Sequence, residues 1–163
     1  MIRTFSALLL LLVLLVLLAG CGGEYVQEER ELTSLYEQYT YNNNQENYTA
    51  NLEFLYPEST AFEQLKSMVD NLNADHQRST YHKLVNVDII EPLPSGVMLV
   101  KAEEVSSLYQ HDFTDPTGEV KSIIAFREYN GQWKILKLFS AETSLEGIKD
   151  EVKEELQRIY AEE

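Results

Sequence analysis

The only thiol of the chain belongs to Cys21, and it follows a strongly apolar stretch. An unbroken apolar run of 13 residues extends from Ala7 to Ala19, behind the positive charge of Arg3. A membrane-spanning helix needs about 20 apolar residues, so this run better fits the apolar region of a secretory signal with a small-residue cleavage site. A lone thiol forms neither an intrachain disulfide nor a zinc-thiolate site. The chemistry of Cys21 is therefore expected to be of another kind.

Leu18, Ala19, Gly20 and Cys21 together resemble the lipobox of a bacterial lipoprotein signal. The resemblance implies that the Cys21 thiol is joined to diacylglycerol and that the chain is cut between Gly20 and Cys21. Each buried CH₂ contributes about 0.8 kcal/mol, so two or three acyl chains anchor durably. We expect a signal peptide at 1–20, a lipidated tether at 21–24 and a membrane as partner through the lipid. The alternatives are an uncleaved anchor and a soluble secreted product.

His82 is the first candidate for acid–base chemistry, because it lies in a segment with a period of two. It alternates with Val85 and Val87 and is therefore expected to point to the opposite face of a strand. A general base must lie within hydrogen-bond reach of its proton and have a pKa tuned by burial or neighbours. The pattern places no Asp and His on one inward face, so we predict no catalytic residue.

A second group of ionisable residues lies in a polar loop, where His111 is close to Asp112, Asp115 and Glu119. The spacing of these carboxylates does not match a calcium-binding loop, and Asp115 is followed by Pro116 in ordinary turn chemistry. We expect a solvated hairpin loop, no metal site and no cofactor.

The charge of the chain limits its partners. The sequence has 13 Lys and Arg against 27 Asp and Glu, a net charge of −14, and loss of Arg3 with the signal leaves −15. Nucleic acid is excluded as a partner, because binding it depends on positive side chains that neutralise phosphates. The same repulsion holds the body away from an anionic membrane, which leaves the lipid as the anchor.

Helical patterns fill the first half of the domain that these residues belong to. Apolar residues recur at helical spacing over 25 to 41, and Asn42, Asn43 and Asn44 are expected to end that helix. A short helix is predicted from 46 to 56, before Pro57. A third helix follows, with Thr60 and Glu63 as a capping box.

Strand patterns fill the second half, and they alternate with clear turn signals. Strands are predicted from 81 to the turn at 92–96, over 97–109, over 119–129 and over 132–139. The Asn130-Gly131 pair between the last two is a strong hairpin signal. We therefore predict an α+β fold in which N-terminal helices pack on a bent four-stranded antiparallel sheet, followed by a C-terminal amphipathic helix.

The order of elements over 42–138, with the closing run Tyr129-Asn130-Gly131-Gln132-Trp133-Lys134-Ile135, is similar to the nuclear-transport-factor-2-like, or cystatin-like, cone superfamily. This resemblance implies a cone whose interior is either filled or open, and some members are isomerases or dehydratases. The stretches 41–44 and 55–62 also resemble the extracellular C-terminal domain of TcaA-type membrane proteins. Those relatives carry a membrane helix where this chain has a lipobox.

The Asn130-Gly131 hairpin predicts which side chains share a face, because residues opposite each other point the same way. One face is expected to carry Ile124, Phe126, Trp133, Ile135 and Phe139, covered by the helix that contains Phe62. With Tyr81, the residues Phe62, Phe126, Trp133 and Ile135 form the candidate pocket or core. The other face is expected to carry Ile123, Ala125, Leu136 and Leu138, with Arg127 opposite Lys134.

That second face needs a cover, since bare apolar patches mark interaction surfaces. The segment 141–163 is predicted to be an acidic amphipathic helix that begins with a capping box of Thr143 and Glu146. Its Leu145, Ile148 and Val152 are expected to dock on Ile123 and Leu136, in the same chain or in a homodimer, and its acidic residues to offset Arg127 and Lys134. The alternative is a helix that projects freely into solvent.

Together these patterns predict one domain over 25–140, one terminal helix, and a lipid-anchored, non-catalytic binding or accessory module of the bacterial cell envelope that faces outside. Its partner would be an envelope protein or a small ligand. One alternative is a small-molecule enzyme of isomerase or dehydratase type that uses the cone pocket. Another is a structural lipoprotein that only holds a membrane partner.

Overall fold

The computed structural model describes residues 25–71 and 80–161. The predicted signal peptide, Cys21 and the tether lie outside these residues. The described elements are α2 (Val26–Asn44), α3 (Tyr48–Asn51), η1 (Leu52–Phe54), α4 (Thr60–Asn71), β1 (Tyr81–Pro92), β2 (Val97–Ser107), β3 (Gly118–Tyr129), β4 (Gln132–Ser140) and α5 (Leu145–Ala161). None of these helices is long and apolar enough to cross a membrane.

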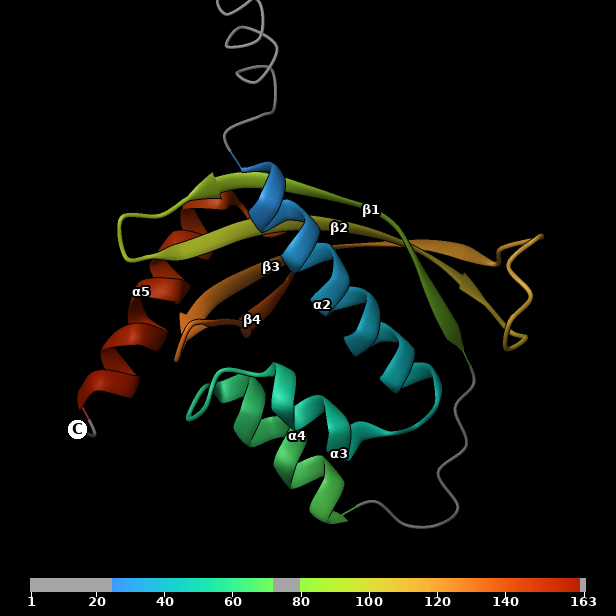
Figure 1. The fold of residues 1–163 in the computed structure, drawn as a ribbon, viewed down its shortest axis with the longest axis horizontal. Helices are drawn as coiled ribbons and strands as arrows, with labels where there is room; N and C mark the ends of the chain where they lie inside the picture. Colours follow the sequence, from blue (N-terminus) through green and yellow to red (C-terminus); the bar gives the residue numbers. More distant parts are fainter. Residues whose placement is uncertain (1–24, 72–79, 162–163) are drawn as a thin grey trace, which may run out of the picture.

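The four strands form one antiparallel sheet in the order β1-β2-β3-β4. Helix α2 crosses one face of the sheet and α5 lies on the other (Figure 1). The α+β prediction, with helices before an antiparallel sheet and a helix after it, is confirmed. The Asn130-Gly131 turn has positive φ at both residues, 52° and 75°, as the tight hairpin requires.

Two apolar clusters fill the space on either side of the sheet. The inner cluster lies under α2 and includes Leu32, Tyr36, Val100, Phe126 and Ile135. The outer cluster lies under α5 and consists of Tyr56, Val97, Leu99, Ile123, Ala125, Leu136, Phe139, Ile148, Val152, Leu156 and Ile159. Because both faces of β2 and β3 are covered, these strands contain runs of buried residues instead of a simple alternation.

A bulge in the last hairpin changes the predicted faces. The register from Tyr129↔Gln132 to Phe126↔Ile135 is regular, but Ala125 then pairs with Lys137, so Leu136 is an extra residue. Beyond it Ile123 pairs with Phe139. The prediction that Phe139 shares the face of Phe126 is therefore wrong, because Phe139 belongs to the outer cluster. Leu138 leaves the outer face for the same reason and is 36% exposed.

Two predicted helix caps are wrong by one residue. Ser59 Oγ, not that of Thr60, accepts the N–H of Phe62 at 3.1 Å, and Ser144 Oγ, not that of Thr143, accepts the N–H of Gly147 at 3.2 Å. In both places the true cap has a second hydroxyl residue directly beside it. Sequence spacing alone does not separate two adjacent hydroxyl residues, since both are good N-caps.

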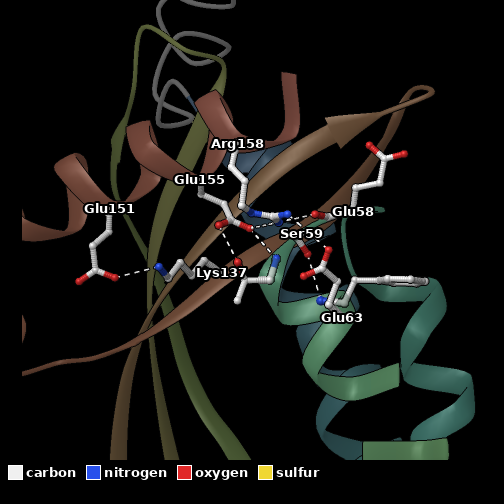
Figure 2. A network of polar contacts seen from close by, with 9 residues as sticks. Glu58, Ser59, Glu63, Lys137, Glu151, Glu155 and Arg158 are labelled. Carbon is white, nitrogen blue, oxygen red and sulfur yellow. Dashed lines mark hydrogen bonds and ion pairs between the residues drawn. The ribbon is translucent and has the colours of Figure 1, made fainter. Parts of the chain in front are cut away.

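Thr60 instead joins α4 to α5 through a buried carboxylate. Glu155 of α5 accepts the backbone N–H of Thr60 and, at 2.7 Å, its hydroxyl. Arg158 donates to Glu155 at 3.1 Å, to Glu63 at 3.3 Å and to the backbone carbonyl of Glu58 (Figure 2). Glu155 is only 5% exposed. This Glu155 network holds α5 to the start of α4, which the apolar patterns of the two helices do not predict.

Candidate functional site

A cleft of about 310 Å³ opens at one end of the inner face. It lies between the C-terminal half of α2, the start of β1 and the loop between β2 and β3. Its lining combines aromatic and apolar walls with polar groups: Glu37, Thr40, Tyr41, Asn44, Gln45, Tyr81, His82, Lys83, Leu84, Gln110, His111 and Phe113. A concave site of this kind, with few polar groups among apolar ones, is typical of small-molecule binding.

A bulge in β1 brings His82 to this cleft. Leu84 pairs with Glu104 and Asn86 with Glu103, so Val85 is an extra residue, and it is 61% exposed. Without the bulge His82 would face away from Val87. With it, His82 and Leu84 share the inner face with Val87, which corrects the prediction that His82 points away from this valine.

The carboxylate of Glu104 lies beside the ring of His82. Glu104 comes from β2 and is 8% exposed, and its Oε2 is 3.5 Å from His82 Nδ1. Thr40 Oγ1 of α2 donates to Glu104 Oε1 at 3.0 Å. A buried carboxylate needs such partners, since an unpaired charge in the interior is costly. The sequence pattern placed no Asp beside a His on one inward face, and the acidic residue that the fold brings to His82 is a glutamate, Glu104.

Tyr36 completes the polar group behind the cleft. Burial raises the pKa of the Tyr36 phenol well above its ordinary value of 10.0, and the charge of Glu104 and a hydrogen bond to it act in the same direction. The phenol thus stays neutral and donates to the carboxylate. The ring of Tyr39 stacks on that of Tyr36 with centroids 6.0 Å apart. We call Tyr36, Thr40, His82 and Glu104 the polar cluster.

Asn44 fixes the backbone of His82 from the end of α2. Its Oδ1 accepts the His82 N–H at 2.9 Å and its Nδ2 donates to the His82 carbonyl. These asparagines were predicted to end the helix, and α2 includes all three and ends at Asn44. The three asparagines bond Gln38, Asn51 and His82 in turn. A run of asparagines that indicates a turn is here a helix end whose side chains make tertiary contacts.

The polar cluster can orient an imidazole for acid–base work or present it to a polar ligand. The Glu104 carboxylate lies 3.5 Å from the imidazole, and the cleft admits a molecule to the same side chains. Among the described residues, no three His, Cys, Asp or Glu side chains come together as a metal site would require.

The other predicted candidates lie in several places. Phe126 and Ile135 are fully buried in the inner cluster, Phe62 and Trp133 pack half-buried against it, and Tyr81 lines the cleft. His111 also lines the cleft, from the loop side. Asp112 does not line the cleft. Its Oδ1 accepts hydrogen bonds from the hydroxyl of Thr114, at 2.6 Å, and from the backbone N–H of the same residue. These bonds lower the pKa of Asp112.

The candidate interaction face is covered within the same chain. Ile148 and Val152 pack with Ile123 and Leu136 in the outer cluster, whereas Leu145 is 36% exposed and lies outside it. Of the three predicted docking residues, Ile148 and Val152 are therefore the buried ones.

The like charges of Arg127 and Lys134 contact other groups than the predicted acidic residues of α5. The guanidinium of Arg127 lies over the rings of Tyr56 and Tyr160, at 5.7 and 5.0 Å, and Lys134 Nζ donates to the Glu53 carbonyl at 2.6 Å. Aromatic rings and a backbone carbonyl, not acidic side chains of α5, surround these two cations.

Comparisons with known proteins support the fold. No family model matches the sequence, and no curated protein matches it. A protein of unknown function with a cystatin-like fold from Nostoc punctiforme is similar in structure, with a TM-score of 0.52 and 12% identity over 74% of this chain and 96% of that one.

Two further solved structures are similar. Aln2 from a Streptomyces species has a TM-score of 0.50 and 6% identity over 69% of this chain and 88% of that one. An NTF2-like protein of unknown function from Pseudomonas putida has a TM-score of 0.49 and 11% identity over 74% and 91%. At such identities likeness extends to the fold alone, and the fold of this chain is the cystatin-like one.

Proposed function

We propose that the protein is a lipid-anchored, non-catalytic binding module of the bacterial cell envelope, facing outside, that takes a small ligand in the cleft beside the polar cluster. The anchor part of the proposal comes from Leu18, Ala19, Gly20 and Cys21. The binding part depends on one observation, the buried Glu104 carboxylate that accepts from Thr40 and lies 3.5 Å from the His82 ring, beside an open cleft.

The walls of the cleft indicate the chemistry of the ligand. Tyr41, Tyr81 and Phe113 offer aromatic surface, and Thr40 and His82 offer polar atoms. A flat or cyclic molecule with a hydroxyl or carbonyl group would match both, since aromatic walls bury its body and the polar atoms fix its orientation.

Equilibrium dialysis tests this proposal. The full-length protein in lipid nanodiscs is dialysed against small cyclic hydroxy and oxo compounds, with empty nanodiscs as the blank. We expect saturable retention of compounds of this class and its loss in His82→Gln. Asn86→Ala is the matched control, because Asn86 lies on the same strand and its side chain bonds the exposed Asp88. Retention that is absent, or equal in His82→Gln and the parent, contradicts the proposal.

The His82–Glu104 pair also favours a second candidate, a small-molecule enzyme of isomerase or dehydratase type. An imidazole beside a buried carboxylate is suited to remove and return a proton. Retained compounds are therefore incubated in D₂O, and exchange of their C–H protons is followed by NMR. Exchange that His82→Gln abolishes while binding persists supports the enzyme; binding without exchange supports the module. A third outcome, in which no compound binds and a membrane protein is captured, supports a structural lipoprotein.

A further inference from the structure

A second concave site lies on the opposite side of the sheet from the cleft. It is a groove of about 600 Å³ that is lined by α5 and by the turn that joins β1 to β2. The ribbon of Figure 1 shows this turn and α5 on the same side of the molecule. The turn contributes Leu93, Pro94 and Ser95, and α5 contributes Lys149, Val152, Lys153, Leu156, Gln157, Tyr160 and Ala161. None of these residues belongs to the polar cluster, so this α5 groove is independent of the proposed function.

The floor of the α5 groove is apolar and well packed. Val152 and Leu156 are buried members of the outer cluster, and Leu93 packs against the same cluster. Tyr160 at one end is held by the Arg127 guanidinium, 5.0 Å from its ring. The opposing turn is tight, because Leu93 N–H donates to the Val97 carbonyl at 2.7 Å and Gly96 has a positive φ of 76°. The groove is thus preformed.

Charge is distributed unevenly around α5. The helix carries five carboxylates, at Glu146, Asp150, Glu151, Glu154 and Glu155, and none of them lines the groove. Its two lysines, Lys149 and Lys153, both line it. Lys149 is already paired with Glu91 at 2.8 Å, whereas Lys153 is exposed and makes no ion pair with any described residue. In a chain of net charge −14, this lining therefore offers an apolar floor and one available positive charge.

The length of the groove indicates the length of a ligand that could lie in it. Lys149 and Ala161 are separated by about 18 Å along the helix axis at 1.5 Å per residue. One leaflet of a bilayer core of about 30 Å is about 15 Å thick, which is the reach of one acyl chain. An extended alkyl chain therefore fits along the groove, and its volume is within the range of small-molecule sites.

We infer that the α5 groove binds a long-chain fatty acid, with the alkyl chain on Val152, Leu156 and Leu93 and the carboxylate at Lys153. The floor of Val152, Leu156 and Leu93 offers no hydrogen-bond partner, so it favours an alkyl chain over a polar group at that place. The single available lysine matches one carboxylate charge. Lysine suits this place, since its stem packs along apolar surface while its ammonium group stays in water.

Photolabelling tests this inference on the full-length protein in detergent-free membranes. The probe is a palmitate analogue with a diazirine in its chain, and a trimethylammonium analogue of equal length is the charge control. We expect labelled peptides that contain residues 93–95 or 152–161, competed by palmitate and not by its methyl ester. Lys153→Glu is expected to lower this label about two- to fivefold, as the loss of one solvent-exposed charge contact would.

Lys66→Glu is the matched variant, because it makes the same charge change on an exposed position of α4. Its label is expected to equal that of the parent. Equal label in Lys153→Glu and the parent, equal label from the cationic probe, or label spread over α2 and α4 overturns the inference. So does an absence of label together with a protein cross-link at Lys153, which would make the groove an interface with another chain.

Discussion

At the scale of single residues, the buried Glu155 carboxylate of the acidic helix α5 joins this helix to α4. It accepts two bonds from Thr60 at the first turn of α4, where the helix dipole also favours a negative charge. It pairs with Arg158 one turn further along α5. Removal of its charge would weaken the bonds from Thr60 and from Arg158, although Arg158 also donates to Glu63 and to the Glu58 carbonyl.

Glu155→Gln is therefore expected to destabilise the domain by about 2 to 3 kcal/mol, the range of hydrogen bonds to a charged group together with donors left unsatisfied. Urea unfolding followed by circular dichroism measures this difference. Glu154→Gln, on an exposed position of the same helix, is expected to change stability by about 0.5 kcal/mol or less. Equal effects of the two substitutions would show that the network contributes nothing.

The same carboxylate predicts a pH dependence. Burial alone would raise the pKa of Glu155, but the hydrogen bonds from Arg158 and Thr60 outweigh it and hold the pKa below its ordinary value of 4.5. A group with a depressed pKa in the folded state stabilises fully above its unfolded pKa and loses this effect as pH falls through the folded value. The stability difference between the parent and Glu155→Gln should thus be constant above about pH 5 and shrink below pH 4.5.

Two aromatic residues of one predicted core differ in burial, and truncation should separate them. Phe126 is 0% exposed, whereas Trp133 is only half-buried. Phe126→Ala is expected to cost about 3 to 5 kcal/mol, and Trp133→Ala clearly less, about 1 to 3 kcal/mol. Chemical denaturation with an unchanged slope measures both. A larger loss for Trp133→Ala would mean that Trp133 is packed more completely than the structure has it.

At the scale of elements, apolar periodicity predicted where helices and strands lie but not how far each face extends. The strands from 81 and from 132 were expected within a residue or so of their bounds, because alternation and turn residues are local signals. The bulges at Val85 and Leu136 have no such local signal in the sequence. Each depends on the partner strand, and each reverses the face of every residue beyond it. His82 and Phe139 were misassigned for this single reason.

The polar cluster could not be predicted from local sequence patterns either. His82 was recognised as a candidate, but Glu104, Thr40 and Asn44 were not, because they come from β2 and α2 and meet only in the folded chain. Glu104 lies between Ala102 and Ser106 on the buried face of β2, and it is the one charged residue of that face. A carboxylate in this position was the available signal.

Helix α5 is the element whose removal should have the largest effect. It buries Ile148, Val152, Leu156 and Ile159 against the sheet. Each such side chain contributes about 1.5 to 3 kcal/mol on burial, so the sum is comparable with the whole stability of a small domain. A chain that ends at Ser140 is therefore expected to lose cooperative unfolding and to bind a hydrophobic dye. A truncated chain as stable as the complete one would contradict the docking of α5.

At the scale of the whole molecule, net charge and the predicted anchor act in opposite directions. The body is strongly acidic, so an anionic membrane surface repels it, within a range of about 8 Å at physiological ionic strength. The segment from Cys21 to the first residue of α2, Val26, spans at most about 18 Å when fully extended. A lipid at Cys21 would thus hold the domain close to a surface that its charge disfavours, and attachment would depend on the lipid alone.

Cys21→Ala is therefore expected to abolish labelling by a fatty-acid probe and to leave the protein as an unprocessed precursor or release it from the membrane fraction. The parent should stay in that fraction in high salt, since salt weakens electrostatic attachment but not acyl-chain insertion. Gly23→Ala is the control, because it changes the tether and keeps the thiol. Labelling that persists in Cys21→Ala would contradict lipidation at this residue, and release of the parent by salt would mean that charged contacts hold it at the membrane.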